Sequence, residues 1–264
     1  MKNRLRFFTS TLSLAVVLAA SPARADEARH NANHLPTHEE LSAALRVVVT
    51  GGSNAGFALN MWATIVNRDG EVTAIAFSGA ERGDQWPGSR VISAQKANTA
   101  NAFSLPHLAL STANLYSATQ PGGTLFGLQH SNPVDTDVAY KGPSEHYGKT
   151  NDPMVGKKIG GVNVFGGGLA LYSADGALLG AIGLSGDTSC TDHIIAWKVR
   201  HLLNLDNVPA GVSPTGDDNI VHDIVINATG HPDSPSGWGH PDCGTAEKAI
   251  AEALPTTYPV GPAR

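Results

Sequence analysis

Apolar and β-branched residues alternate with polar ones in four short runs along the chain, which is typical of β-strands. In two places an Asp-Gly pair separates one run from the next, and this dipeptide between β-branched runs is a strong hairpin signal. We therefore predict two antiparallel hairpins. Their strands cover residues 59–66 with 71–77 and residues 169–172 with 177–184.

Apolar residues at helical spacing predict helices before, between and after these hairpins. Thr37 and Glu40 form a capping box, in which each residue satisfies a free amide of the first helical turn. Thr188 or Ser189 is placed to cap the last of these helices. The predicted helices cover residues 37–51, 89–103, 107–118 and 188–203.

Two long segments have no such period. Residues 127–160 are polar and irregular, and a loop of that length usually has a function or covers something. Residues 206–264 are rich in Pro, Gly and Asp and are expected to lie over the domain as an irregular C-terminal extension. Hairpins with helices around them predict an α+β fold with a central antiparallel β-sheet flanked by helices.

The composition excludes several classes of protein. Charged residues make up only 16% of the chain and the net charge is −5 at pH 7. A disordered chain or a coiled coil would need many more charged residues. Basic residues form no stripe that could follow a phosphate backbone, so we expect no nucleic-acid partner.

The N-terminus has the pattern of a secretion signal. Three basic residues precede the apolar run 7–20, and an A-x-A cleavage pattern ends at Ala25. The alternative is a membrane anchor, but the run is shorter than the ~20 residues that a spanning helix needs. We therefore expect an exported protein, periplasmic or secreted, with no membrane partner.

These patterns divide the chain into four expected parts: a signal peptide 1–25, a mobile leader 26–36, a domain 37–205 and the C-terminal extension 206–264.

Removing the signal peptide takes away four basic residues and no acidic ones, which moves the net charge from −5 to −9. A charge of that size favours solubility.

Cys190 and Cys243 are the two cysteines of the chain. In an exported protein, two cysteines indicate a disulfide more often than a metal pair or a nucleophile. Closing a loop of roughly 50 residues would stabilise the fold by about 4 kcal/mol in the chain-entropy model. The alternative is two buried free thiols.

Two regions of the chain carry recognisable motifs, residues 61–70 (MWATIVNRDG) with 94–100 (AQKANTA), and residues 160–169 (GGVNVFGGGL) with 180–186 (GAIGLSG). Taken together, they resemble the GlcG/HbpS-like haem-binding family, and in particular its long exported members. The resemblance covers residues 37 to about 205 in order.

The resemblance implies a single α+β domain with a profilin- or PAS-like sheet, and a tendency to form homo-oligomers. Exported members are described as binding haem or as sensing iron and redox stress. Other members accompany the breakdown of glycolate or diols, in unclear roles. The family therefore implies a fold more strongly than one chemistry.

Haem iron takes His, Met, Cys or Tyr as its axial ligand. Candidates are His38 in the capping box, His107 after Pro106, and His130 at the start of the long loop. Related domains place a haem-binding histidine near the first helix, close to the position of His38. The more ordinary role for each of these histidines is that of a surface or packing residue. Covalent c-type attachment is excluded, because the chain has no C-x-x-C-H.

Lys96 and Thr99 match the family's helix motif and lie three residues apart, on one helix face. They could bind a haem propionate or another carboxylate. Alternatively, Lys96 pairs with Glu81 or Asp84 and has a structural role.

Two groups of residues could ligate a metal ion, and each has another explanation. Cys190 and His193 have a Cys-x-x-His spacing, but a disulfide would consume the thiolate. The His-Pro-Asp repeats at 231–233 and 240–242 could bind zinc or copper, although turn chemistry accounts for them equally well.

The main functional hypothesis is an exported protein that binds haem non-covalently for scavenging, storage or redox sensing. Known catalytic motifs are absent from the sequence, so a binding protein is favoured over an enzyme. An alternative is an enzyme or accessory protein for a small hydroxy- or oxo-acid, with Lys96 and the helix start at Thr188 binding the carboxylate. A third reading is a scaffold that assembles through residues 127–160.

Overall fold

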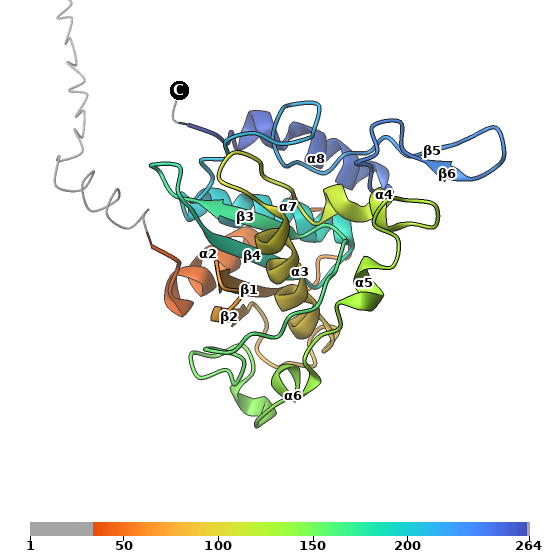
Figure 1. Ribbon diagram of the computed structural model, residues 1–264. Coiled ribbons are helices and arrows are strands. Elements are labelled where there is room, and N and C mark those ends of the chain that lie inside the picture. Colours follow the sequence, from red (N-terminus) through yellow and green to blue (C-terminus); the bar gives the residue numbers. More distant parts are fainter. Residues whose placement is uncertain (1–33, 263–264) are drawn as a thin grey trace, which may run out of the picture. The chain divides into compact units, whose positions relative to one another are not determined.

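A computed structural model describes residues 34–262 (Figure 1). The predicted signal peptide, its cleavage after Ala25 and nearly all of the leader 26–36 lie outside the described residues. Among the described helices, none combines the length and the apolar character needed to cross a membrane.

The predicted hairpins are present and form one four-stranded antiparallel sheet. The strand order is β2-β1-β4-β3, so the two central strands come from different hairpins. Ile65 of β1 lies opposite Ile182 of β4 across this junction. The strands are β1 (Trp62–Asn67), β2 (Val72–Phe77), β3 (Gly168–Tyr172) and β4 (Leu178–Ser185).

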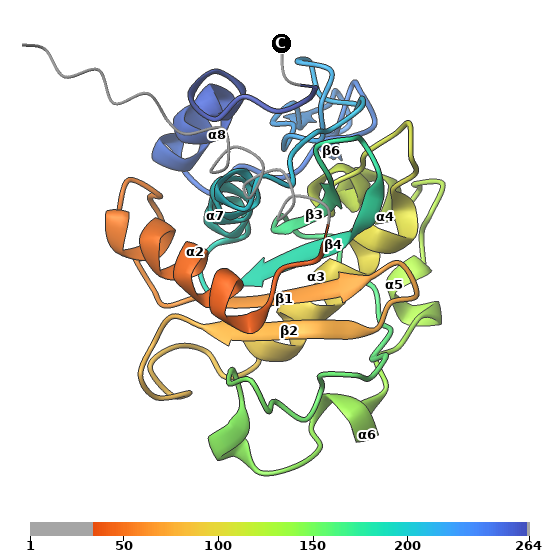
Figure 2. The same ribbon diagram turned by 90° about the vertical axis from the view of Figure 1, so that its left-hand side faces the viewer.

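Helices cover both faces of the sheet, as Figure 2 shows. Helix α2 (His38–Gly51) and helix α7 (Ser189–Leu202) pack on one face, and helix α3 (Ser89–Phe103) packs on the other. Successive side chains of a strand point to opposite faces, so Ile65 joins the core under α2 and α7 while Val66 joins the core under α3. The fold is therefore α+β, with a central antiparallel sheet between helices.

Residues 107–118 form less helix than predicted. They contain only the 3₁₀ turn η1 (Ala113–Leu115) and the short helix α4 (Tyr116–Thr119). The backbone amides that precede η1 form hydrogen bonds to other parts of the chain: the amide of Ala109 donates to the carbonyl of Ala210, and the amide of Thr112 donates to the carbonyl of Gly168. Tertiary hydrogen bonds therefore replace the intrahelical ones.

The long loop 127–160 contains three short helical turns and runs along the β2 edge of the sheet (Figure 1). The amide of Val72 donates to the carbonyl of Lys157, and the amide of Gly156 donates to the carbonyl of Val72. The turns are α5 (Leu128–Ser131), α6 (Thr136–Ala139) and η2 (Ser144–His146).

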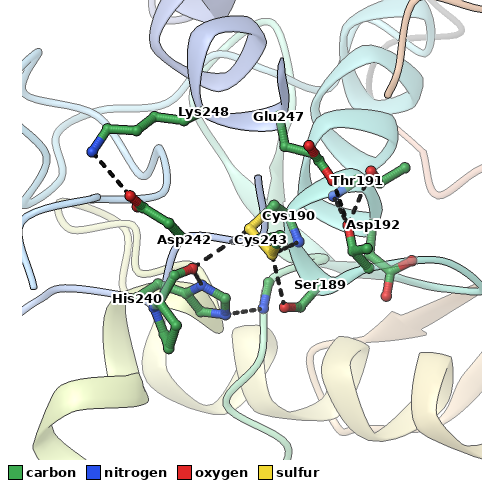
Figure 3. Close-up of a disulfide and its surroundings, with 12 residues drawn as sticks. Ser189, Cys190, Thr191, Asp192, His240, Asp242, Cys243, Glu247 and Lys248 are labelled. Atoms are coloured by element: carbon green, nitrogen blue, oxygen red, sulfur yellow. Dashed lines mark hydrogen bonds and ion pairs between the residues drawn. A yellow bond between two sulfur atoms is a disulfide. The ribbon is translucent and has the colours of Figure 1, made fainter. Parts of the chain in front are cut away.

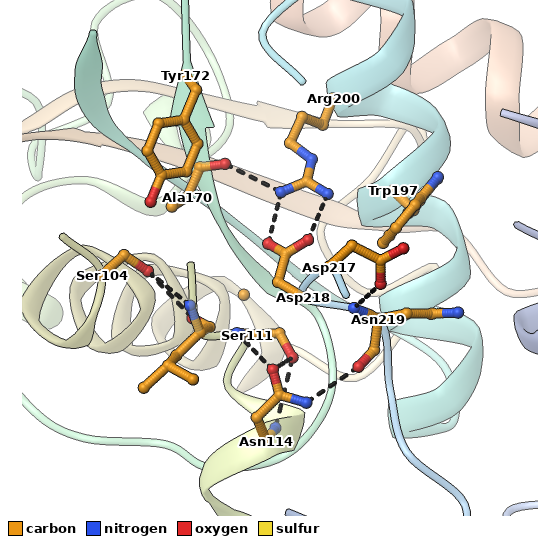
Figure 4. Close-up of polar contacts among 12 residues, drawn as sticks. Ser104, Ser111, Asn114, Ala170, Tyr172, Trp197, Arg200, Asp217, Asp218 and Asn219 are labelled. Atoms are coloured by element: carbon orange, nitrogen blue, oxygen red, sulfur yellow. Dashed lines mark hydrogen bonds and ion pairs between the residues drawn. The ribbon is translucent and has the colours of Figure 1, made fainter. Parts of the chain in front are cut away.

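The C-terminal extension packs beside α7 and includes a helix that the sequence analysis did not predict. This helix, α8 (Thr245–Thr257), buries Ala251 and Leu254 against the core. A small exposed hairpin, β5 (Val225–Ile226) with β6 (Pro232–Asp233), projects from the extension (Figure 1). Figure 4 shows how Arg200 of α7 binds Asp218 of the extension through two hydrogen bonds of 2.6 and 2.8 Å.

Candidate ligand-binding site

A cavity of about 530 Å³ opens where α2, the end of β2 and the long loop meet. This volume lies in the range of small-molecule sites. Three segments far apart in the sequence form its walls. They contribute His38, Ser42 and Arg46 from α2, Phe77 and Gly79 to Arg82 from the end of β2, and Ser144, Glu145 and Tyr147 to Lys149 from the loop.

His38 is the first residue of α2, directly after the N-cap Thr37, whose capping box with Glu40 is complete. Its Nδ1 lies 2.8 Å from the carbonyl oxygen of Ile75 in the edge strand β2. A carbonyl can only accept, so Nδ1 carries the proton of the neutral ring and Nε2 keeps the lone pair. This is the arrangement in which a second partner orients a histidine ligand.

Phe77 lines the cavity and is held by an aromatic stack on the buried Trp62. The rings of Trp62 and Phe77 lie face to face, 4.3 Å apart between centroids. Gly148 covers the stack with a φ of +80°, and a Cβ there would come within 2.9 Å of the Phe77 Cβ. Only glycine fits this position without strain, because the backbone is left-handed and the approach is close.

Permanent cations outnumber carboxylates around the cavity. Arg46, Arg82 and Lys149 are exposed lining residues, and the carboxylates among the lining residues are Glu81 and Glu145. An anionic group of a ligand would therefore find a guanidinium or ammonium partner at the rim.

A buried ion pair fixes the loop wall. Arg90 of α3 donates through Nε and Nη2 to the two carboxylate oxygens of Asp152, and through Nη1 to the carbonyl of Ala139 at 2.7 Å. The ring of Tyr147 stacks on this guanidinium, 3.6 Å from centroid to Cζ. The amide of Gly148 donates to Asp152 at 2.8 Å, so the pair positions the residues that line the cavity.

Among the predicted site residues that lie within residues 34–262, only His38 lines this cavity. His107 is exposed in the turn between Leu105 and Leu108. His130 is exposed on the short helix α5. The structure therefore separates these histidines from His38.

Lys96 and Thr99 are buried on α3, and each forms hydrogen bonds to other residues of the protein. The Nζ of Lys96 is 2.7 Å from the carboxylate of Asp192 in α7, a partner that the sequence analysis did not consider. Burial raises the pKa of Asp192 to about 6, although Lys96 acts in the opposite direction. Thr99 donates to the carbonyl of Gln95 and accepts from the amide of Asn163.

The predicted disulfide is present and joins Cys190 of α7 to Cys243 of the extension, with the two Cα atoms 6.0 Å apart (Figure 3). The neighbouring histidines are already hydrogen-bonded. The Nε2 of His193 accepts from the amide of Ile220, and that of His240 accepts from the amide of Gly166. Within residues 34–262, no group of three or more His, Cys, Asp or Glu side chains could hold a metal ion.

Sequence reasoning missed the basic and aromatic residues of the cavity. A signal existed for the α2 wall, because His38, Ser42 and Arg46 are spaced at i, i+4 and i+8 and so share one helix face. No local pattern joins this face to residues 77–82 or 144–149, which reach the site through tertiary contacts.

A family model described as "Haem degrading protein HbpS-like" matches residues 37–200. A crystal structure of Klebsiella pneumoniae protein ORFY is 23% identical, with a TM-score of 0.42, and the match covers 62% of this chain and 86% of that chain. A crystal structure of a PduOC–haem complex is 24% identical, with a TM-score of 0.45, and the match covers 65% of this chain and 96% of that chain. No curated protein matches the chain.

Proposed function

This chain belongs to the HbpS-like family of haem-degrading proteins, and from that premise we propose that it binds haem non-covalently in the cavity beside His38. The observation that carries the proposal is the state of the His38 ring. His38 lines the cavity and its Nδ1–H donates to the carbonyl of Ile75, so that in the neutral ring Nε2 keeps its lone pair. Bound haem would supply a redox-active iron, and a neutral imidazole nitrogen is a suitable axial ligand for it.

The remaining lining residues match the other parts of a haem molecule. Phe77, held by its stack on Trp62, offers a flat apolar surface to a porphyrin face. Arg46, Arg82 and Lys149 offer cations to the two propionates. The donor set is thus one nitrogen ligand, one aromatic wall and a basic rim.

The polar lining of the cavity favours reversible binding of haem over a haem that is permanently enclosed in the protein. A resident haem is usually held in a largely apolar pocket, whereas most residues around this cavity are polar or charged. We therefore propose haem scavenging, storage or sensing as the role.

We also propose that the protein is exported to the periplasm or beyond the cell. The N-terminal pattern supports this, and a disulfide between Cys190 and Cys243 is compatible with an oxidising compartment. Measuring the mass of the protein recovered from the extracytoplasmic fraction tests it, with an N-terminus at Asp26 expected. Recovery of the uncleaved chain in the cytoplasm would contradict export.

The alternative of a small hydroxy- or oxo-acid ligand relied on Lys96 and the start of α7. The ammonium of Lys96 is bound to Asp192, and the hydroxyl of Thr188 accepts from the amide of Thr191. No observation at these residues favours a free carboxylate ligand, so the proposal stays with haem.

A hemin titration of the oxidised protein, followed by its Soret absorbance, tests the proposal. We expect a saturable spectrum, and we expect His38→Gly to weaken binding at least tenfold and to change the spectrum. Added imidazole should restore that spectrum, because it can supply the missing nitrogen ligand. His107→Ala and His130→Ala serve as controls and should bind as the unmodified protein does. A spectrum unaffected by His38→Gly would overturn the assignment.

A further inference from the structure

We propose that Arg46, oriented by Ser42, makes the cavity select porphyrins with free propionates over porphyrins whose propionates are esterified. This role for Arg46 rests on the proposed function, because it takes His38 as the ligand of the iron. It assigns the choice of ligand to one particular cation of the rim. Ser42 is a positioning residue, since it would act on the ligand through Arg46.

Helix α2 brings an iron ligand and a cation to the same cavity. His38, Ser42 and Arg46 follow one another at intervals of four residues, and all three line the cavity. Each interval advances the helix by about 6 Å, roughly one turn. The propionates of haem leave the edge of the porphyrin, away from the iron at its centre. A cation farther along the helix than the iron ligand is therefore placed to meet a propionate.

The side chain of Arg46 turns back toward His38. Its Nη2 donates to the Oγ of Ser42 at 3.2 Å, so the guanidinium reaches a residue about one turn nearer to His38. Long helical side chains lean toward the N-terminus of their helix, and His38 is the first residue of α2. The hydrogen bond to Ser42 therefore holds the guanidinium on the side of Arg46 where the iron ligand lies.

The guanidinium of Arg46 keeps donors for a ligand. Its bond to Ser42 uses one nitrogen, and no carboxylate within residues 34–262 forms an ion pair with it. The planar fork of an arginine binds a carboxylate through two parallel hydrogen bonds. An ester has no charge and is a weaker acceptor, so this contact separates a free propionate from an esterified one.

The other two cations of the rim are not held in this way. Arg82 and Lys149 are exposed, and neither forms an ion pair within the described part of the chain. Ordering a long side chain on a ligand costs conformational entropy, and Arg46 has lost part of that freedom to Ser42 already. We therefore expect Arg46 to contribute more to the selection than either of them.

Titrations with two ligands test the selection. Hemin and hemin dimethyl ester are titrated separately into the oxidised protein, and the ratio of their dissociation constants measures the preference for free propionates. We expect Arg46→Gln to lower this preference by about fivefold or more, and Arg82→Gln to lower it by less than about twofold. Lys158→Gln is the charge-matched control, because Lys158 is exposed and does not line the cavity. The Soret spectrum of the hemin complex should be the same in Arg46→Gln, since His38 is unchanged.

The positioning role of Ser42 has its own test. Ser42→Ala should lower the preference for hemin by about twofold to threefold, and Ser42→Thr, which keeps a hydroxyl, should restore it. Neither variant should change the affinity for the dimethyl ester, which a general disturbance of α2 would change.

Two different failures can be told apart. If Arg46→Gln weakens hemin and its ester equally, or weakens neither, the selection is not made by Arg46, even when His38→Gly still alters the hemin spectrum. An equal loss of preference in Arg82→Gln also overturns the assignment, because the choice then belongs to the charge of the rim as a whole. A hemin spectrum that does not depend on His38 overturns the proposed function, and the role of Arg46 with it.

Discussion

At the scale of single residues, three buried cations each face one aspartate. Arg90, Lys96 and Arg200 are at most 2% exposed, and they bind Asp152, Asp192 and Asp218. Each pair joins segments distant in sequence: α3 to the long loop, α3 to α7, and α7 to the extension. Removing one member would leave an uncompensated buried charge, which costs about 3–5 kcal/mol.

Asp218→Asn should therefore lower the free energy of unfolding by about 3–5 kcal/mol, because Arg200 loses the charge of its partner. Urea denaturation measures the change. Asp69→Asn is the matched control, since Asp69 is exposed in the first hairpin turn. A loss for Asp218→Asn no larger than that of this control would show that the Arg200 charge finds another partner.

The acid stability of the protein should depend on His240. Burial lowers the pKa of this imidazole from 6.5 to about 4. The unfolded chain then binds a proton at a higher pH than the folded protein does, so the contribution of His240 to stability is present above pH 6.5 and is lost as the pH falls toward 4. An NMR titration of the His240 ring should give a midpoint near 4, and an ordinary midpoint near 6.5 would contradict its burial in solution.

At the scale of elements, the contact between α3 and β4 requires small residues on both sides. Gly183 of β4 lies so close to α3 that a Cβ there would be 2.0 Å from the carbonyl oxygen of Ser93. Helix α3 presents Ala94, Ala97 and Ala100 to the sheet. The run of small residues in the sequence thus sets the distance between this helix and the sheet.

Gly183→Ala should destabilise the protein by about 1–3 kcal/mol, because the backbone of α3 must move away from β4. Thermal or urea unfolding measures this loss. Gly83→Ala provides the control, since a Cβ at Gly83 would meet nothing within 4 Å. Equal stability of the two variants would mean that α3 can shift at no cost.

The ion pair between α3 and the long loop should control the affinity of the cavity. Arg90→Lys keeps the charge but loses the paired hydrogen bonds to Asp152 and the stacking of Tyr147. We expect hemin affinity to fall by about tenfold, which corresponds to about 1.4 kcal/mol.

Arg200→Lys is the control for that experiment, because it weakens a similarly buried pair whose residues do not line the cavity. It should lower stability and leave hemin affinity unchanged. Equal losses of affinity in both variants would indicate a global effect on folding.

At the scale of the whole molecule, the disulfide joins the ends of a long excursion of the chain from α7 through the extension. Cys243→Ser should lower the free energy of unfolding by up to about 4 kcal/mol, since the unfolded chain regains the entropy of an open loop. A folded domain is typically stable by about 5–15 kcal/mol, so the variant should still fold. Circular dichroism and urea denaturation test both statements, and a variant without native structure would contradict the second.

Features that depend on a few adjacent residues could be predicted from the sequence. The capping box at Thr37, the two Asp-Gly turns and the small-residue helix 89–103 are all present in the structure. Helix α8 had a usable signal in its apolar residues Ile250, Ala251 and Leu254, but the Pro- and Gly-rich composition of the whole segment hid it. Local signals succeed because such elements are stabilised mainly within four or five residues.

The sequence by itself determined the strands, the three helices α2, α3 and α7 that pack on the sheet, the pairing of the two cysteines and the family resemblance. Only the tertiary structure decided that β1 and β4 pair, that Lys96 binds Asp192, and that His38 shares a cavity with Phe77 and Lys149. The physical reason is that a buried charge requires a partner but does not specify which one, and an apolar strand requires neighbours but not their order. Those choices are made when all the packing surfaces are satisfied at once.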